Sequence, residues 1–529
     1  MKISICNSSI QQGHPQRQFD LYFHEIQKAA ASGADIIVLP NNFPDTFASA
    51  SRRIETSFLK EFHSAFTKLA AIAPDCLITG QTCQNIMDAP NCWIIRNNQI
   101  TITDEYTDVY KQQRIRITTK PSRANDENTL QICLLNTPFD KSGSHIPDLH
   151  TNSLYISPLG IRDNGKTIDV YDGNIYAVNF PAGIHTLPPH LCTLTYINGE
   201  FSVCSPTSPH TMTSVLRFAL QELCARWKIR QVIIGVSGGI DSALNLMLYR
   251  SVLPSSHLLA VNMPSRYNSD STKQAALELA QALDIPYLTI PIQESVEFTC
   301  KQLNNIMATQ NTGKHVSNFV FENIQARDRS SRILAALSAM YNGVFTCNAN
   351  KAEITIGYGT MYGDISGFLC ATGDLWKHEI YMMAKEINAT YYHNKALPSA
   401  ILTLPPSAEL SADQNPETAQ GDPLCYPYHD RLFRAWTESS DPLDLTKTIE
   451  LYRHGILADV IETPVSINNL FATERDFISD TVRWWRMFRG LAVAKRLQSP
   501  PIISLCPYTF GARSEAQQEN DDGIIYDLI

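Results

Sequence analysis

Short apolar stretches separated by polar turns dominate the first two hundred residues of the chain. Such stretches fit strands, whose successive side chains point to opposite faces of a sheet. One longer segment, residues 18–32, is expected to form a helix. We expect strands at residues 3–6, 36–39, 76–79, 92–96, 99–103, 130–135, 153–157 and 175–179. Strands flanked by helices predict a layered α/β sandwich in this part of the chain.

The pattern changes after a stretch rich in Ser, Thr and Pro that ends near residue 212. From there, strands and helices alternate, which predicts a parallel sheet with helices on both faces. Strands are expected at 231–236, 258–262, 287–290 and 343–346, and helices at 215–227, 271–283, 294–307 and 324–341. We therefore predict a first domain over residues 1–204, a linker over 205–212 and a second domain over 213–529.

A glycine turn joins the strand at 231–236 to the next helix, in the sequence Ser237-Gly238-Gly239-Ile240-Asp241-Ser242. Adjacent glycines let backbone N–H groups approach an anion, and the positive end of the helix points to the same place. Asp241 would repel phosphate unless a cation lies between them, which points to Mg²⁺. A bare Gly-Gly pair favours an ordinary turn between strand and helix, but the full string resembles the ATP-binding loop of the PP-loop pyrophosphatases. The spacing differs from the Walker pattern, which requires four residues between its glycines and then a lysine.

Further motifs follow this loop in a characteristic order. They are MPS at 263–265, ENIQARDR at 322–329, NKAE at 350–353, GYGTMYGD at 357–364, DLWK at 374–377 and PPSAEL at 405–410. Together they resemble the NAD⁺ synthetases, from about residue 215 to about residue 511. The resemblance implies a C-terminal PP-loop (adenine nucleotide alpha hydrolase-like) domain. Its reaction is the ATP-dependent amidation of nicotinic acid adenine dinucleotide to NAD⁺, through an adenylated intermediate and with release of AMP and pyrophosphate.

The resemblance assigns roles to individual residues of the second domain. ATP and the leaving pyrophosphate are held by Ser237, Gly238, Gly239, Asp241 and Ser242. It implies Mg²⁺ on Asp241 and Glu353, and phosphoryl charge stabilised by Lys377. The acid dinucleotide is assigned to Asn323 and Arg327, with Asp364 near its nicotinate end.

These assignments compete with plainer readings of the same residues. Taken alone, Arg327 fits a solvated helix face and Glu353 an ordinary surface acid. Two positions also depart from the family pattern. Asn348-Ala349 replaces Thr-Gly, and Leu404 replaces a basic residue, so we expect altered substrate affinity with retained chemistry.

The first domain resembles the nitrilase-like glutaminase domain of the large NAD⁺ synthetases, an α-β-β-α sandwich. In that chemistry a Cys attacks an amide, a Glu accepts the thiol proton and a Lys stabilises the oxyanion. Cys133 and Lys111 lie in the matching strings, but Asn41 occupies the Glu position, and an amide cannot act as a base at neutral pH. Leu134 and Leu135 follow Cys133, which favours a buried core cysteine. We expect a degenerate glutaminase and ammonia as the direct nitrogen donor.

Composition limits the remaining possibilities. With 44% hydrophobic and 18% charged residues, the chain is typical of a globular protein, and its net charge of −9 argues against a general nucleic-acid surface. Thirteen cysteines without CxxC pairs indicate neither a zinc site nor a disulfide framework and suit a reducing cytoplasm. No stretch is apolar enough for a membrane span. The family resemblance also implies at least a homodimer.

Three alternative functions are retained. One is a fully glutamine-dependent synthetase in which Cys133 is active. Another is a catalytically silent paralogue that acts as a binding subunit. The third, tRNA thiolation, is disfavoured by the acidic charge and the absence of CxxC pairs.

Overall fold

The computed structural model describes residues 1–10, 15–42, 76–82, 91–96, 99–120, 128–143, 148–179, 183–187, 192–202, 210–411, 414 and 421–511. The chain forms two compact units. Unit 1 comprises Met1–Asn164 and Ile168–Val215, and unit 2 comprises Gly165–Thr167 and Leu216–Ile529. Most of the predicted linker, residues 205–209, lies outside the described residues.

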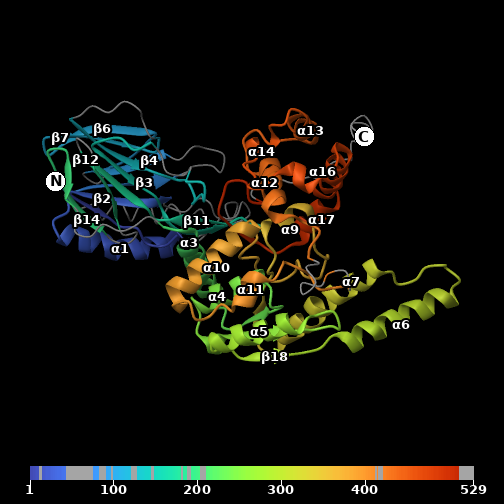
Figure 1. Cartoon of the computed structure of the whole chain (residues 1–529). Coiled ribbons are helices and arrows are strands. Elements are labelled where there is room, and N and C mark those ends of the chain that lie inside the picture. Colours follow the sequence, from blue (N-terminus) through green and yellow to red (C-terminus); the bar gives the residue numbers. More distant parts are fainter. Residues whose placement is uncertain are drawn as a thin grey trace. The chain divides into compact units, whose positions relative to one another are not determined.

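Unit 1 contains two sheets stacked face to face (Figure 1). The first is ordered β15 (Glu200–Ser202), β14 (Cys192–Ile197), β1 (Lys2–Ile5), β2 (Ile36–Asn42), β3 (Leu77–Thr82), β4 (Asn91–Arg96), β5 (Gln99–Thr103). The second is ordered β13 (Gly183–Leu187), β12 (Ile175–Asn179), β9 (Ser153–Ile156), β8 (Thr129–Leu134), β7 (Gln113–Thr118), β6 (Glu105–Tyr110). Strands β10 (Leu159–Asp163) and β11 (Thr167–Asp172) pair antiparallel.

Apolar side chains explain how these layers hold together. Ile3, Ile5 and Val38 of the first sheet form one buried cluster with Ile115 and Ile132 of the second. Helix α1 (Pro15–Ala31) buries its own apolar face in a separate cluster, which includes residues of β2, β3 and β4. The predicted sandwich is confirmed, because each sheet presents alternate residues to a shared core.

Unit 2 is built on a parallel sheet ordered β18 (Tyr287–Thr289), β17 (Leu258–Asn262), β16 (Val232–Gly235), β19 (Val344–Phe345). All three strand pairs are parallel, as predicted. Strands β17 and β18 follow β16 in the sequence and lie on one side of it, whereas β19 lies on the other side of β16. The switch of direction therefore lies between β16 and β19, and the carboxyl ends of strands at such a point form a ligand-binding crevice.

Helices surround this sheet. The helices that precede β19 are α3 (Met212–Arg226), α4 (Ile240–Arg250), α5 (Asp270–Ala282), α6 (Gln293–Thr309), α7 (Asn318–Arg327) and α8 (Ala335–Met340). A π-helical segment, Asp328–Leu334, joins α7 to α8 and makes them one continuous rod. Figure 1 shows α6 and α7 extending away from the sheet.

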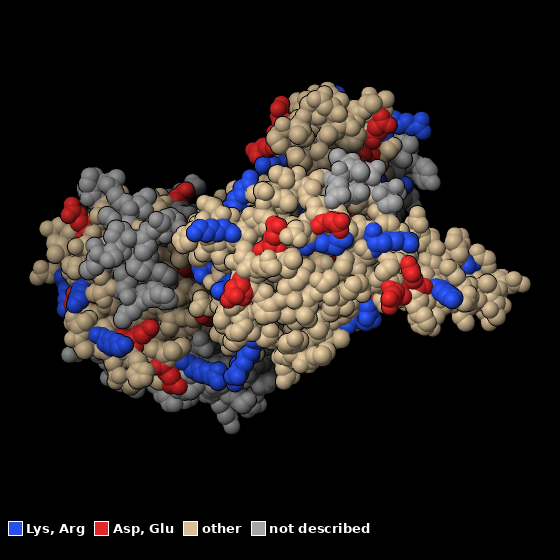
Figure 2. Space-filling view, turned by 60° about the horizontal axis from the view of Figure 1, so that its bottom comes forward, with Lys and Arg blue, Asp and Glu red and all other residues tan. Residues whose placement is uncertain are grey.

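The rest of unit 2 is mainly helical and has its own buried cluster, rich in Trp, Tyr and Phe. Its elements are α9 (Lys351–Ile356), α10 (Lys377–Tyr392), α11 (Ser399–Thr403), α12 (Tyr426–Thr437), α13 (Leu445–Arg453), α14 (Leu457–Val460), α15 (Ile467–Leu470), α16 (Glu474–Arg489), α17 (Leu491–Gln498) and β20 (Ile502–Ser504). Among the residues that the structure describes, no helix combines the length and apolar character needed to cross a membrane. Figure 2 shows Lys and Arg interspersed with Asp and Glu on the face in view.

Candidate active site

The loop after β16 is held in shape by its own side chains and by close packing. Gly238 has a φ of +90°, and a Cβ there would lie 2.1 Å from the carbonyl oxygen of Thr272. The Ser242 hydroxyl accepts from the Ser237 N–H at 3.2 Å and donates to the Gly239 carbonyl at 3.0 Å. Helix α4 starts after Gly239, and among the described residues no side chain caps its N-terminus. Its first N–H groups are therefore suited to an anion.

A charged centre lies beside this loop. Lys377, at the start of α10, donates to Asp241 Oδ2 at 2.5 Å, and the Asn350 amide donates to Asp241 Oδ1 at 3.0 Å. Asn350 also caps α9. Its N–H donates to Glu353 Oε2 at 3.2 Å, while the Glu353 N–H donates to Asn350 Oδ1 at 3.1 Å. One asparagine thus connects the two carboxylates to which the family resemblance assigns the metal.

The protonation of the centre follows from its charges. Partial burial and then the Asp241 carboxylate raise the pKa of Glu353 well above its ordinary value. Burial disfavours the charge of Lys377, but Asp241 and Glu353 outweigh burial and raise the pKa of Lys377. The lysine is therefore a cation at neutral pH, and two acids face one ammonium. A bound divalent cation would favour the carboxylate form of both acids and so lower the pKa of Glu353.

These groups surround a cavity of about 290 Å³ at the carboxyl ends of the strands. Of the residues predicted to form the site, Ser237, Gly238, Gly239, Asp241, Ser242, Glu353, Asp364 and Lys377 line it. The cavity therefore brings together the glycine loop before α4, helix α9 and the start of α10. Both departures from the family pattern, Asn348 and Leu404, also line it. Asn348 is engaged by the protein itself, since its amide donates to the Gly235 carbonyl at 2.9 Å.

Two predicted substrate residues lie apart from this lining. On α7, the Asn323 amide donates to the Phe319 carbonyl of its own helix at 2.8 Å. Arg327 is exposed, and its Nε donates to the Met361 carbonyl at 3.1 Å. Neither residue lines the cavity, so their assignment to the dinucleotide stays a prediction.

The cavity also contains charged residues to which the sequence assigned no role. Arg329 lies in the π-helical segment, donates to the Met263 carbonyl at 3.0 Å, and has a pKa lowered to about 10 by burial. Glu409 is buried and accepts from the Ser269 N–H at 3.0 Å and from the Thr272 hydroxyl at 2.9 Å. Both belong to motifs recognised in the sequence. Only their placement around the cavity distinguishes them from other motif residues.

In unit 1, two residues of the predicted glutaminase site, Lys111 and Cys133, do not come together. Lys111 is exposed and forms an ion pair with Asp35. The strand register places Cys133 opposite Thr118, at the far end of β7 from Lys111. The intervening strand spans about 17 Å at ~3.3 Å per residue. Asn41 belongs to β2, but its side chain lies outside the described residues.

The surroundings of Cys133 are those of a core residue. Its side chain is fully buried with Leu135, Tyr155 and Tyr176, and burial raises its pKa to about 12. Nearby, the buried Gln81 amide donates to the Pro40 carbonyl at 2.5 Å and to the Leu135 carbonyl at 2.7 Å. An amide therefore bridges the ends of β2 and β8.

Known proteins resemble this chain in sequence and in fold. Residues 212–459 match the NAD synthase family. The glutamine-dependent NAD(+) synthetase of Xanthomonas campestris is 34% identical over 243 residues, which cover 46% of this chain and 41% of that protein. The enzyme of that name from Rhodobacter capsulatus is 32% identical over 291 residues, which cover 52% and 51%. The matched segment thus spans about half, or less, of these relatives.

Solved structures extend the likeness of fold to the whole chain. The glutamine-dependent NAD(+) synthetase of Cytophaga hutchinsonii has a TM-score of 0.72 at 13% identity, over 100% of this chain and 99% of that one. The corresponding enzyme of Acinetobacter baumannii, solved with ADP, has a TM-score of 0.65 at 16% identity, over 98% and 99%. At these identities the structures establish the shared two-domain fold.

Proposed function

We propose that this chain, which carries an NAD synthase domain over residues 212–459, amidates nicotinic acid adenine dinucleotide to NAD⁺ at the expense of ATP. One observation carries the proposal: Asp241, Glu353 and Lys377 meet beside the glycine loop at the switch point of the parallel sheet. ATP adenylates the substrate carboxylate, pyrophosphate leaves, and ammonia displaces AMP.

The residues divide this chemistry between them. The glycine loop and the N-terminus of α4 would hold the phosphates through N–H groups. The carboxylates of Asp241 and Glu353 are hard oxygen donors in one cavity, so they fit Mg²⁺, which neutralises phosphate charge when bound. Lys377 donates to Asp241 at 2.5 Å, and this contact would orient its ammonium toward the bound phosphates.

We further propose ammonia as the direct nitrogen donor. Four features of unit 1 support this: Asn41 at the position of the base, a buried Cys133 with a raised pKa, the separation of Lys111 from Cys133, and the Gln81 amide between the ends of β2 and β8. The relatives are named as glutamine-dependent, so a working glutaminase with another base is the main alternative.

A homo-oligomer, at least a dimer, is part of the proposal. Large apolar side chains are exposed on the rod formed by α7, the π-helical segment and α8, including Phe319 at 73% and Met340 at 78%. Phe298 and Ile306 of α6 are exposed as well. Exposed apolar groups of this size are typical of surfaces that pack against another chain.

The test measures NAD⁺ formation from ATP, Mg²⁺ and the acid dinucleotide, with ammonium or glutamine as the nitrogen source. We expect turnover with ammonium and at least 100-fold less with glutamine. Comparable turnover with glutamine that disappears in Cys133→Ala would refute ammonia as the donor. No pyrophosphate release with either source would refute the synthetase function and favour a catalytically silent binding subunit.

A further inference from the structure

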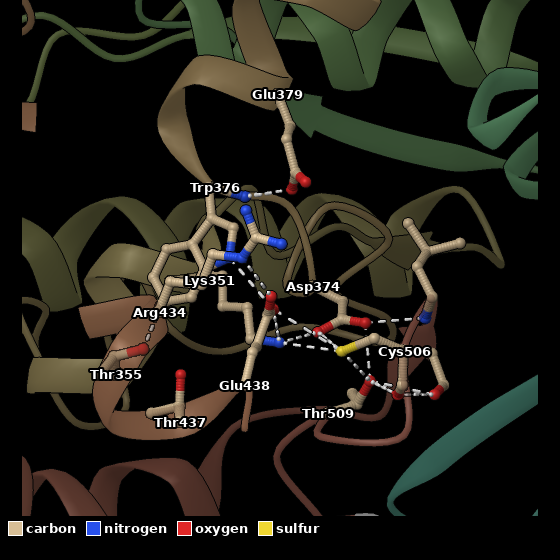
Figure 3. A network of polar contacts seen from close by, with 12 residues as sticks. Lys351, Thr355, Asp374, Trp376, Glu379, Arg434, Thr437, Glu438, Cys506 and Thr509 are labelled. Carbon is tan, nitrogen blue, oxygen red and sulfur yellow. Dashed lines mark hydrogen bonds and ion pairs between the residues drawn. The ribbon is translucent and has the colours of Figure 1, made fainter. Parts of the chain in front are cut away.

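A buried lysine lies behind the charged centre, outside the cavity lining. The side chain of Lys351, the first residue of α9, is fully buried. Its ammonium donates to Asp374 Oδ1 at 2.5 Å, Glu438 Oε1 at 2.6 Å and Cys506 Sγ at 3.3 Å. Figure 3 shows these groups converging from separate segments of unit 2.

The ammonium is the resident cation of this cluster. Ligand atoms of Asp374, Glu438 and Cys506 lie within 4.8 Å of one another, a spacing that would suit a metal, but Lys351 already contacts all three. Burial opposes the charge of Lys351, yet Asp374 and Glu438 raise its pKa well above the ordinary value. Arg434 adds a second positive charge, 3.3 Å from Glu438. Two cations thus balance two carboxylates.

The cluster also fixes the chain segments around it. Asp374 Oδ2 accepts from the Leu505 N–H at 2.7 Å and from the Thr509 hydroxyl at 2.6 Å. The indole of Trp376 donates to Glu438 Oε1 at 3.0 Å. The C-terminal segment, the end of α12 and the turn before α10 are therefore held at a single point.

The start of α9 and the turn before α10 also carry the charged centre. Lys351 lies between Asn350, which contacts Asp241, and Glu353. Asp374 precedes Lys377 by one short turn, and the Lys351 N–H donates to the Leu375 carbonyl at 2.8 Å. Any shift of Lys351 against Asp374 therefore changes how the starts of α9 and α10 face Asp241.

We propose that Lys351 is a positioning residue for the reaction: with Asp374 and Glu438 it sets the relative placement of Glu353 and Lys377 around Asp241. The inference rests on the proposed function and adds a residue that lies outside the cavity lining. Apolar packing of similar volume would stabilise the fold as well as a buried ion cluster does. Directional hydrogen bonds, in contrast, fix distances between segments.

The experiment compares Lys351→Met with the double variant Lys351→Met/Glu438→Gln in the full-length protein. The single variant leaves two buried carboxylates opposite Arg434 alone, so its Tm should fall by roughly 5–15 °C. The double variant restores the charge balance and should recover at least half of that loss. Its kcat for ammonia-dependent NAD⁺ formation should stay about 10- to 100-fold below wild type, with the KM for ATP changed less than about threefold. The exposed Lys447→Met serves as the matched control.

Recovery of both Tm and kcat in the double variant would show a merely structural role and overturn the inference. A double variant with a raised KM for ATP and an unchanged kcat would also overturn the inference. If Lys351→Met does not fold, Glu438→Gln alone provides the test: kcat should fall at least threefold, and an unchanged kcat refutes positioning. If the wild-type protein itself forms no NAD⁺ with ammonia, the proposed function is refuted, and this outcome is distinct from a failure of the positioning inference.

Discussion

Replacing Gly238 by alanine adds one atom, the Cβ, to the glycine loop after β16. The backbone φ of +90° is unfavourable for alanine by roughly 1–2 kcal/mol. The new Cβ would lie 2.1 Å from the Thr272 carbonyl oxygen, and real Cβ contacts do not fall below 3.0 Å, so loop and helix α5 must separate by about 0.9 Å. Such overpacking costs about 1–3 kcal/mol. We therefore expect a total destabilisation of about 2–5 kcal/mol.

Activity should suffer more than stability. A displacement near 1 Å at a reacting group costs on the order of 100-fold in rate, so NAD⁺ formation should fall by about that factor while the protein remains folded. The assay combines ammonia-dependent NAD⁺ formation with urea unfolding followed by circular dichroism.

Gly455→Ala is the matched control. Gly455 has a similar φ of +71°, but a Cβ there meets nothing within 4 Å. This variant should show the backbone strain alone, at roughly 1–2 kcal/mol, with wild-type turnover. If Gly238→Ala keeps more than a third of wild-type turnover, or if the two variants are equally stable, the loop does not depend on its contact with Thr272.

Three further outcomes are expected. Lys377→Met removes the cation that contacts Asp241 and should lower kcat/KM by about 10²–10³-fold in a pyrophosphate-release assay, and a loss below tenfold would contradict its role. Native Cys133 should resist iodoacetamide up to about pH 10. Because the pKa of Cys133 is higher in the folded than in the unfolded protein, its contribution to stability is complete below the ordinary thiol pKa of 9.0 and is lost as the pH rises toward about 12. Alkylation is followed by peptide mass spectrometry, and alkylation at pH 8 would refute the burial of this thiol. Glu409→Ala leaves the Thr272 hydroxyl and the Ser269 N–H without their carboxylate and should cost about 2–4 kcal/mol in urea unfolding, whereas a change below ~0.5 kcal/mol would show that these bonds do not stabilise the fold.

Apolar patterning predicted much of the fold and failed where apolar residues are sparse. The strand expected at 258–262 coincides with β17, which is buried along its whole length. Strands β6 and β7 were not predicted, because neither EYTDVY nor QRIRIT contains a continuous apolar stretch like those used to predict the other strands. The helix expected to begin at residue 324 begins at Asn318, where Ser317 caps it and the exposed Phe319 breaks the amphipathic pattern.

Motifs identified most of the charged centre but not its connections. Asp241, Glu353 and Lys377 were recognisable because each lies in a short, ordered string. The bond between Asn350 and Asp241 joins residues 109 positions apart, and the one between Lys351 and Glu438 joins residues 87 apart. No local pattern encodes such pairs. They follow from the way α9, α10 and α12 pack against the sheet loops in the folded unit.

The sequence by itself determined the layered class of both units, the glycine loop and the likeness of residues 212–459 to the NAD synthase family, since each depends on local spacing and residue type. Tertiary structure alone decided that Lys111 and Cys133 lie at opposite ends of β7, because strand register is a property of the paired sheet. It likewise decided that the Lys351 ammonium is the cation contacted by Asp374, Glu438 and Cys506, because folding brings charges from distant segments close enough to require balance.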